Sequence, residues 1–157
     1  MNWLSWLVWG FAGTVTLTAL MASSQGVGLT RMNLPYLLGS MVTADRDRAN
    51  PLGVLVHLVN GWVFSLVYVG AFHAWGGPTW WKGALIGLAH AGFVLAAGLP
   101  ALPGVHPRMA SERRGPTVVR QLEPPGFFGL NYGYRTPLSI VLAHLAFGII
   151  LGAFYRP

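Results

Sequence analysis

The sequence predicts an all-α integral membrane protein, a four-helix bundle with two structured loops on one side of the bilayer. Only 9% of its 157 residues are charged and 54% are hydrophobic, whereas a soluble domain carries about 25% charged residues. Four stretches are continuously apolar, at about residues 3–24, 53–75, 80–102 and 137–155. Each reaches or approaches the roughly 20 residues that a helix needs to cross the hydrocarbon core, and none alternates as a transmembrane β-strand does. We therefore expect a single membrane domain over residues 1–157.

The first apolar stretch has some features of a secretory signal, because Ala22, Ser23 and Ser24 are small enough for a cleavage site. The residues before it, Met1 and Asn2, carry no basic side chain, however, and the apolar run is longer than that of a typical signal. We expect a retained transmembrane helix.

The connection at residues 25–52 contains a short apolar segment. Asn33 suits the position before a helix and Pro35 suits its first turn. The segment is too short to span the bilayer, so we expect a short helix at the membrane interface. The charged residues from Asp45 to Arg48 then return the chain to water.

The connection at residues 103–136 is rich in proline, which prevents a continuous helix. It also carries the aromatic residues Phe127, Phe128, Tyr132 and Tyr134, which are costly to leave in water. We expect this connection to pack as a lid across its end of the bundle.

The basic residues are distributed unevenly about the apolar stretches. The two long connections hold eight of them, Arg31, Arg46, Arg48, Arg108, Arg113, Arg114, Arg120 and Arg135, and the rest of the chain holds two, Lys82 and Arg156. By the positive-inside rule both connections face the cytoplasm and both termini face outward. Arg108, Arg113, Arg114 and Arg120 form a basic cluster that suits contact with anionic lipid or with a partner protein. These positions favour topology signals over nucleic-acid binding.

Pairs of glycines occur at helical spacing in the third and fourth apolar stretches, at Gly83 and Gly87 and at Gly148 and Gly152. Such pairs let helices approach closely inside a membrane. They predict packing within the bundle or, as the alternative, a seam between copies of the chain.

Three histidines lie inside the predicted spans, and an ionisable residue there is a candidate functional group. His57 and His144 lie at similar depth, Asn60 is one turn from His57, and His90 is nearer the middle of the bilayer. Three interpretations remain open: a structural polar contact between helices, ligands of a haem or metal ion, or part of a proton or substrate path. No carboxylate lies in any span to complete a site for a divalent metal, and the chain has no cysteine.

A catalytic site would have to come from the connections, where polar residues are dispersed. The candidates are Asp45, Asp47, His106, Arg108, Glu112, Glu123 and Asn131, with Ser111 lacking an evident base. They match no reaction signature, which makes an enzyme at the membrane interface the weaker alternative.

Several short motifs resemble families of small bacterial inner-membrane proteins of unknown function. The residues that carry this resemblance are Gly10 to Thr14, Met21, Met32 to Pro35, Leu38, Gly39, His57, Gly61, Phe64 and Gly87 to His90. The resemblance implies a four-helix protein of the bacterial inner membrane and implies no activity.

The sequence thus favours a non-enzymatic accessory or structural subunit of a larger membrane assembly, whose partners are lipids and other subunits or further copies. A membrane protein that binds haem or a metal through His57, His144 and His90 is the second hypothesis. A small interface enzyme or transporter is the third.

Overall fold

Helices and no strands make up the regular structure of the protein in the computed structural model, which describes all residues 1–157. The segments in order are α1 (Trp3–Gly26), α2 (Leu34–Val42), α3 (Arg46–Ala74), α4 (Trp80–Phe93), the π-helical turn η1 (Val94–Gly98), α5 (Leu99–Val105), the 3-10 segment η2 (Phe127–Tyr132) and α6 (Thr136–Phe154). Four spans are long and apolar enough to cross a membrane: α1, α3, the continuous run α4–η1–α5, and α6. The predicted all-α fold with four helices able to span a membrane is confirmed.

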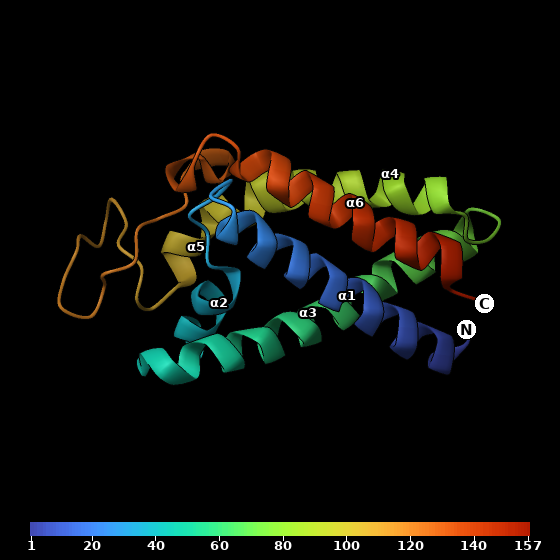
Figure 1. Ribbon diagram of the computed structural model, residues 1–157, viewed down its shortest axis with the longest axis horizontal. Coiled ribbons are helices and arrows are strands. Elements are labelled where there is room, and N and C mark those ends of the chain that lie inside the picture. The colour runs from blue at the N-terminus through green and yellow to red at the C-terminus, as the bar shows by residue number, and fades with distance from the viewer.

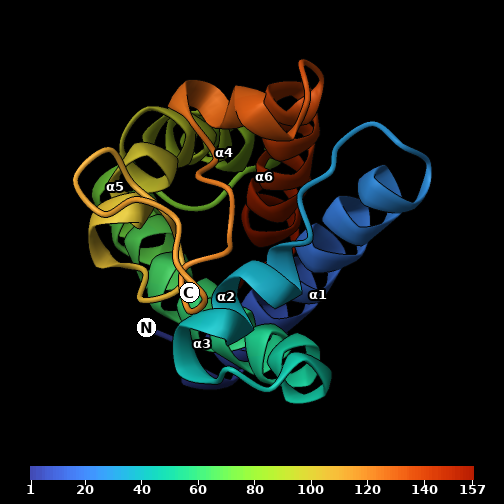
Figure 2. The ribbon, with the colours of Figure 1, turned by 90° about the vertical axis from the view of Figure 1, so that its left-hand side faces the viewer.

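The four spans form two packed pairs that diverge from one end of the molecule. Helix α1 packs against α3 and α6, and α6 packs against α4, whereas the backbones of α3 and α4 lie apart beyond the turn that joins them. The α1–α3 pair and the α4–α6 pair therefore separate toward the end that carries the long connections (Figure 1), and Figure 2 looks into that open end. Helices α2 and α5 occupy the space between the pairs there.

The two long connections lie at one end of the bundle, and both termini lie at the other (Figure 1). An ion pair between Arg31 and Glu123, with an N–O distance of 3.2 Å, joins the two connections. The hydroxyls of Thr30 and Thr136 lie 2.7 Å apart and join the first connection to the start of α6.

Helix α3 begins seven residues before the expected start at residue 53. The Asp45 carboxylate accepts hydrogen bonds from the backbone N–H groups of Asp47 and Arg48, and this cap starts the helix at Arg46. Pro51 lies within the first two turns of α3 at an exposed position. Charged residues expected in a water-exposed link thus form the first turn of α3.

The predicted short helix of the first connection is confirmed as α2. Its N-cap Asn33 accepts a hydrogen bond of 2.9 Å from the Tyr36 N–H. Gly39 faces Gly53 of α3 so closely that a Cβ on either would strike the other helix's backbone. Helix α2 therefore packs on the start of α3.

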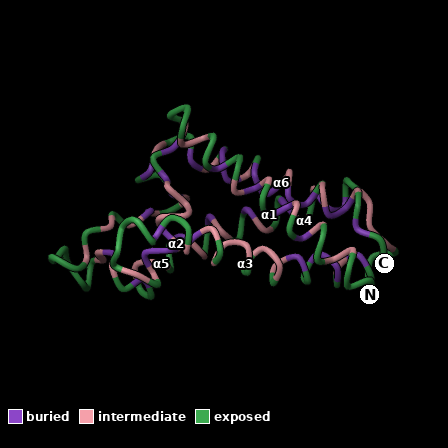
Figure 3. The backbone as a smooth tube through the Cα atoms, turned by 60° about the horizontal axis from the view of Figure 1, so that its bottom comes forward, coloured by how far each residue is buried: buried purple, intermediate pink, exposed green.

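The predicted lid is correct for only part of the second connection. Met32, Leu99 and Thr136 surround Gly129 of η2, and Tyr132 is buried. The stretch before η2 instead extends away from the bundle (Figures 1 and 3), with Val118 90% exposed. Phe127 and Tyr134, which we expected to be covered, are also exposed.

Candidate functional site

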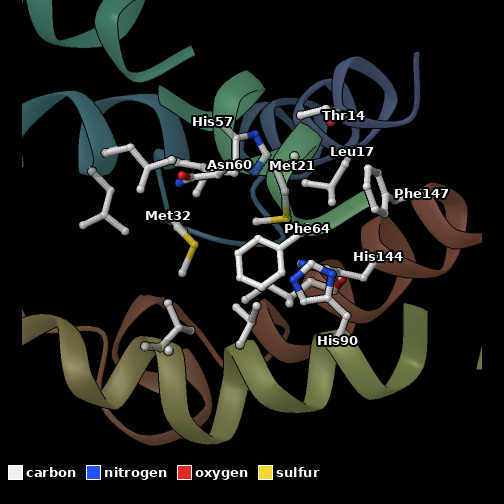
Figure 4. Close-up of a pocket in the computed structure, with 18 of the residues that line it drawn as sticks. Thr14, Leu17, Met21, Met32, His57, Asn60, Phe64, His90, His144 and Phe147 are labelled. Carbon is white, nitrogen blue, oxygen red and sulfur yellow. Dashed lines mark hydrogen bonds between the residues drawn. The ribbon is translucent and has the colours of Figure 1, made fainter. Parts of the chain in front are cut away.

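A cavity of about 240 Å³ lies between the two helix pairs. Its wall is mostly apolar, with Leu, Met, Phe, Val and Ile side chains from every helical segment except η2. The histidines His57, His90 and His144 line it together with Asn60, and no Asp, Glu, Lys or Arg does so. Figure 4 shows these side chains on opposite walls of the cavity. The structure therefore brings the predicted polar residues of three spans to one place.

Of the three cavity histidines, His90 and His144 contact each other and His57 lies apart from them. His90 and His144 meet edge to face, with ring centroids 4.7 Å apart and an interplanar angle of 81°. His57 lies on the α3 wall, where its Nδ1 is 2.8 Å from the Thr18 hydroxyl of α1. The sequence places His57 and His144 at similar depth, but the direct partner of His144 is His90.

In each of the three cavity histidines, the Nδ1 atom makes a hydrogen bond within the protein. His90 Nδ1 lies 3.1 Å from the Tyr68 hydroxyl, and His144 Nδ1 lies 2.8 Å from the Ile140 carbonyl oxygen. The Nε2 atoms of His57, His90 and His144 have no hydrogen-bond partner in the chain. The Asn60 side chain is exposed in the middle of α3. The cavity thus presents unpaired polar atoms within a span.

The α4–α6 contact that positions the histidine pair is built on the predicted glycines. A Cβ on Gly83 would strike the Gly148 carbonyl, and a Cβ on Gly152 would strike the Thr79 carbonyl. Gly87 packs in the same way against the His144 backbone. Of the two interpretations of these glycines, packing within the bundle is the one that the structure shows.

A separate groove borders the cavity, along the gap between α3 and α4. It measures about 290 Å³ and shares Phe64, His90 and Phe93 with the cavity wall. The Phe64 ring stacks on His90, with centroids 4.5 Å apart at 27°. Phe64 therefore stands between the cavity and a surface that faces lipid.

The π-helical turn η1 also borders the cavity, through Val94 and Gly98. Such single turns occur frequently at functional sites because they shift the face that a helix presents. Here the turn follows His90 by one helical turn.

The polar residues of the connections do not assemble into a catalytic site. Asp45 caps α3, Glu123 pairs with Arg31, and the Asn131 amide donates to the Pro124 carbonyl. Asp47 and Glu112 are exposed, and Ser111 bonds only to the backbone of its own turn. These contacts are structural.

His106 is buried and locks the second connection to α2. Its Nδ1 accepts from the Arg108 N–H at 3.1 Å, so Nε2 carries the hydrogen that it donates to the Leu37 carbonyl at 3.0 Å. An Nε2 that carries hydrogen cannot act as a base toward the Ser40 hydroxyl 3.3 Å away. Burial lowers the pKa of His106, the Leu37 hydrogen bond opposes this shift and the Arg108 charge adds to it.

The basic cluster is only partly free to meet a lipid or a partner. Arg108 is half-buried and donates to the Ser40 carbonyl, and Arg120 bonds the Gly115 carbonyl of its own loop. Arg113 and Arg114 are exposed on the projecting loop.

The cavity holds the three histidines that the sequence offered as possible haem or metal ligands. His90 and His144 contact each other, which leaves no gap for a planar macrocycle between them. No three side chains of the His, Cys, Asp or Glu type come together in a ligand set.

Sequence reasoning missed Thr18, Phe64 and Tyr68 as members of this site. A signal was present for two of them, because His57, Gly61, Phe64 and Tyr68 recur at the spacing of one helix face. Thr18 lay among three threonines at alternate positions of α1, Thr14, Thr16 and Thr18.

Compared with family models, curated proteins and solved structures, the chain matches none of them.

Proposed function

We propose that this protein is a membrane protein that binds a small uncharged amphiphilic molecule in the cavity between its helix pairs. The observation that carries the proposal is the lining: His57, Asn60, His90 and His144 in an otherwise apolar wall without a charged side chain. Ligand sites combine an apolar wall with a few convergent polar groups in this way.

The unpaired polar atoms support a polar occupant. Burying an amide or imidazole nitrogen without a hydrogen bond costs roughly 1–3 kcal/mol in proteins. The Asn60 amide is exposed on a span and bonds to nothing else in the chain, and lipid offers it no hydrogen bond. A ligand head group that bonds these atoms removes the cost.

The size of the cavity favours a head group with its tail elsewhere. At about 240 Å³ it is smaller than the roughly 300–1,000 Å³ of sites that enclose a whole drug-sized molecule. The groove between α3 and α4 adds about 290 Å³ and opens where a bilayer surrounds the protein. A molecule dissolved in the membrane can therefore reach the cavity sideways.

The test is a variant that fills the cavity without disturbing the helix packing. A Cβ on Gly98 would meet only the Phe93 carbonyl oxygen, at 3.9 Å, and Gly98 lines the cavity. Gly92 is its matched control, because it is exposed on the same span with nothing within 4 Å of its Cβ position.

We expect mass spectrometry of molecules extracted from the purified protein to find an amphiphile with the wild type and with Gly92→Leu. Gly98→Leu should retain at least roughly tenfold less of it. Equal amounts in all three proteins, or none in the wild type after mild extraction, count against the proposal.

We also propose a bacterial inner-membrane location with the long connections in the cytoplasm, supported by the basic residues and by the resemblance above. The chain has no cysteine, so Ser111→Cys and Pro157→Cys give single labelling sites at opposite ends. A maleimide that cannot cross membranes should label Pro157→Cys on intact spheroplasts and Ser111→Cys only after lysis. The reverse pattern would overturn this orientation.

The roles of accessory subunit and haem protein, expected from the sequence, have weaker support. Exposed apolar faces, such as that of Val59, Val63 and Val67 on α3, suit lipid as well as a neighbouring subunit. The contact between His90 and His144 disfavours haem held between these two rings.

A further inference from the structure

We infer that the molecule bound in the cavity carries a hydroxyl group, as an alcohol or a phenol, and donates its hydrogen to one of the two histidines that offer a lone pair. This inference rests on the proposed binding function and adds the chemical class of the ligand. It follows from the hydrogen bonds that fix which nitrogen of each ring carries hydrogen.

The first assignment concerns His57. Thr18 has one hydroxyl hydrogen, and it donates this hydrogen to the Thr14 carbonyl at 2.7 Å. The Thr18 oxygen can therefore only accept from His57 Nδ1, 2.8 Å away. In the neutral ring a hydrogen on Nδ1 leaves Nε2 with a lone pair, so His57 offers an acceptor.

The second assignment concerns His144. Its Nδ1 lies 2.8 Å from the Ile140 carbonyl, which can only accept. Nδ1 therefore carries the hydrogen, and Nε2 is again an acceptor. His90 does not enter the assignment, because its partner, the Tyr68 hydroxyl, can either donate or accept.

Two of the three imidazoles that line the cavity thus require a donor. An ether, ester or ketone offers only acceptors and leaves both lone pairs unpaired. A hydroxyl group has one hydrogen and so pairs one of these two lone pairs, and its oxygen can accept from the Asn60 amide.

The absence of charged side chains from the cavity wall indicates that the head group of the ligand is also uncharged. A carboxylate or phosphate head group brings a negative charge and no hydrogen, and the cavity wall has no Lys or Arg to neutralise it. A charge without a partner is much more costly in a low-dielectric site than a neutral hydroxyl group.

The test compares probes of one chain length that differ only at the head: 1-dodecanol, dodecyl methyl ether and dodecanoic acid. The full chain is first stripped of its endogenous amphiphile and then reconstituted in lipid nanodiscs. Each probe is added to this sample, and binding is measured by native mass spectrometry. We expect the alcohol to bind roughly tenfold more tightly than the ether, the scale of one added hydrogen bond in a protected site. The acid should bind more weakly than the alcohol.

A variant pair checks that the preference comes from the assigned ring. Thr18→Val keeps the shape but removes the acceptor that holds the hydrogen on His57 Nδ1. The alcohol-to-ether ratio should fall at least threefold. Thr16→Val is the control, because the Thr16 hydroxyl bonds only the Ala12 carbonyl of the same helix, and it should keep the wild-type ratio.

The outcomes separate the inference from the function on which it rests. If no probe binds the wild type, and Gly98→Leu retains as much endogenous amphiphile as Gly92→Leu, the binding function itself fails. If the ether or the acid binds as tightly as the alcohol, the binding function stands and the hydroxyl assignment is wrong. An unchanged ratio in Thr18→Val also overturns the assignment.

Discussion

The imidazoles of His90 and His144 meet edge to face at 4.7 Å because a glycine lets their helices approach. Gly87 lies one turn before His90 and packs against the His144 carbonyl, where no Cβ fits. The glycine contact between α4 and α6 and the polar face of the cavity are therefore one feature. A change to the glycine is a change to the site.

Gly87→Ala is expected to destabilise the bundle and to disturb the cavity. The added methyl group meets backbone, which cannot move aside as a side chain can, and overpacking of this kind costs about 1–3 kcal/mol. We expect a lower Tm in detergent and weaker retention of the bound amphiphile. Gly92→Ala, in the same helix but with free space at its Cβ position, should keep both. Equal behaviour of the two variants would show that the close approach is not required.

The sequence predicted the spans and the members of the site better than it predicted their pairing. Apolar length locates a span, and Asn33 marks the start of α2, because both are local properties of the chain. His57, Asn60, His90 and His144 were identified because polar residues within spans are rare. Which histidine touches which depends on the order of helices around the bundle, and apolar length carries no information on that order.

The errors at the connections have a similar cause. The start of α3 at Arg46 depends on the Asp45 cap, a local signal that the charged run obscured. The burial of Tyr132 and the exposure of Tyr134 depend on the kink at Phe128, whose φ is +56°. An aromatic residue in the sequence does not reveal which side of such a kink it occupies.

His106 is expected to make stability dependent on pH. Burial lowers its pKa below the ordinary value of 6.5, so the unfolded chain takes up a proton at a higher pH than the folded one. The contribution of neutral His106 to the free energy of unfolding is complete above about pH 6.5. It declines by up to about 1.4 kcal/mol per pH unit as the pH falls toward the folded pKa. Unfolding measured between pH 7.5 and pH 5 should show this loss.

His106→Gln separates this residue from the histidines of the cavity. The amide can still donate to the Leu37 carbonyl but does not titrate. We expect a smaller loss of Tm on acidification than in the wild type. If the slope is unchanged in His106→Gln, the pH dependence arises elsewhere.

Lys82 is expected to stabilise the turn between α3 and α4. It is buried, and its Nζ donates to the carbonyls of Trp75 at 2.6 Å and Gly77 at 3.0 Å. It also lies over the rings of Trp75 and Trp81. Hydrogen bonds from a charged donor contribute about 1.5–3 kcal/mol.

Lys82→Met should therefore lower the free energy of unfolding by roughly 1–3 kcal/mol and speed hydrogen exchange near this turn. Arg156→Met, at an exposed position of the same end, should change stability by less than about 0.5 kcal/mol. A neutral effect of Lys82→Met would mean that water replaces the ammonium group at both carbonyls.

Phe64 borders both the cavity and the groove, so in the proposed function a ligand that enters from the lipid passes this ring. Its ring stacks on His90 and is tilted against Phe93, with centroids 6.5 Å apart, and it borders both the cavity and the groove. Figure 4 shows the ring between the α3 wall and the histidine pair. Removal of this ring joins the two spaces and leaves the imidazole atoms that bind the head group in place.

Phe64→Ala should therefore change the rate of exchange more than the affinity. We expect deuterated 1-dodecanol bound to the protein to be displaced by unlabelled alcohol at least roughly tenfold faster, with a smaller change in Kd. The lost ring removes apolar contact from the tail and so weakens binding somewhat. Phe11→Ala, which removes an exposed ring of α1 outside the cavity, should leave the exchange rate unchanged. Displacement at the wild-type rate in Phe64→Ala would mean that the ligand reaches the cavity by another route, through the open end between α2 and α5.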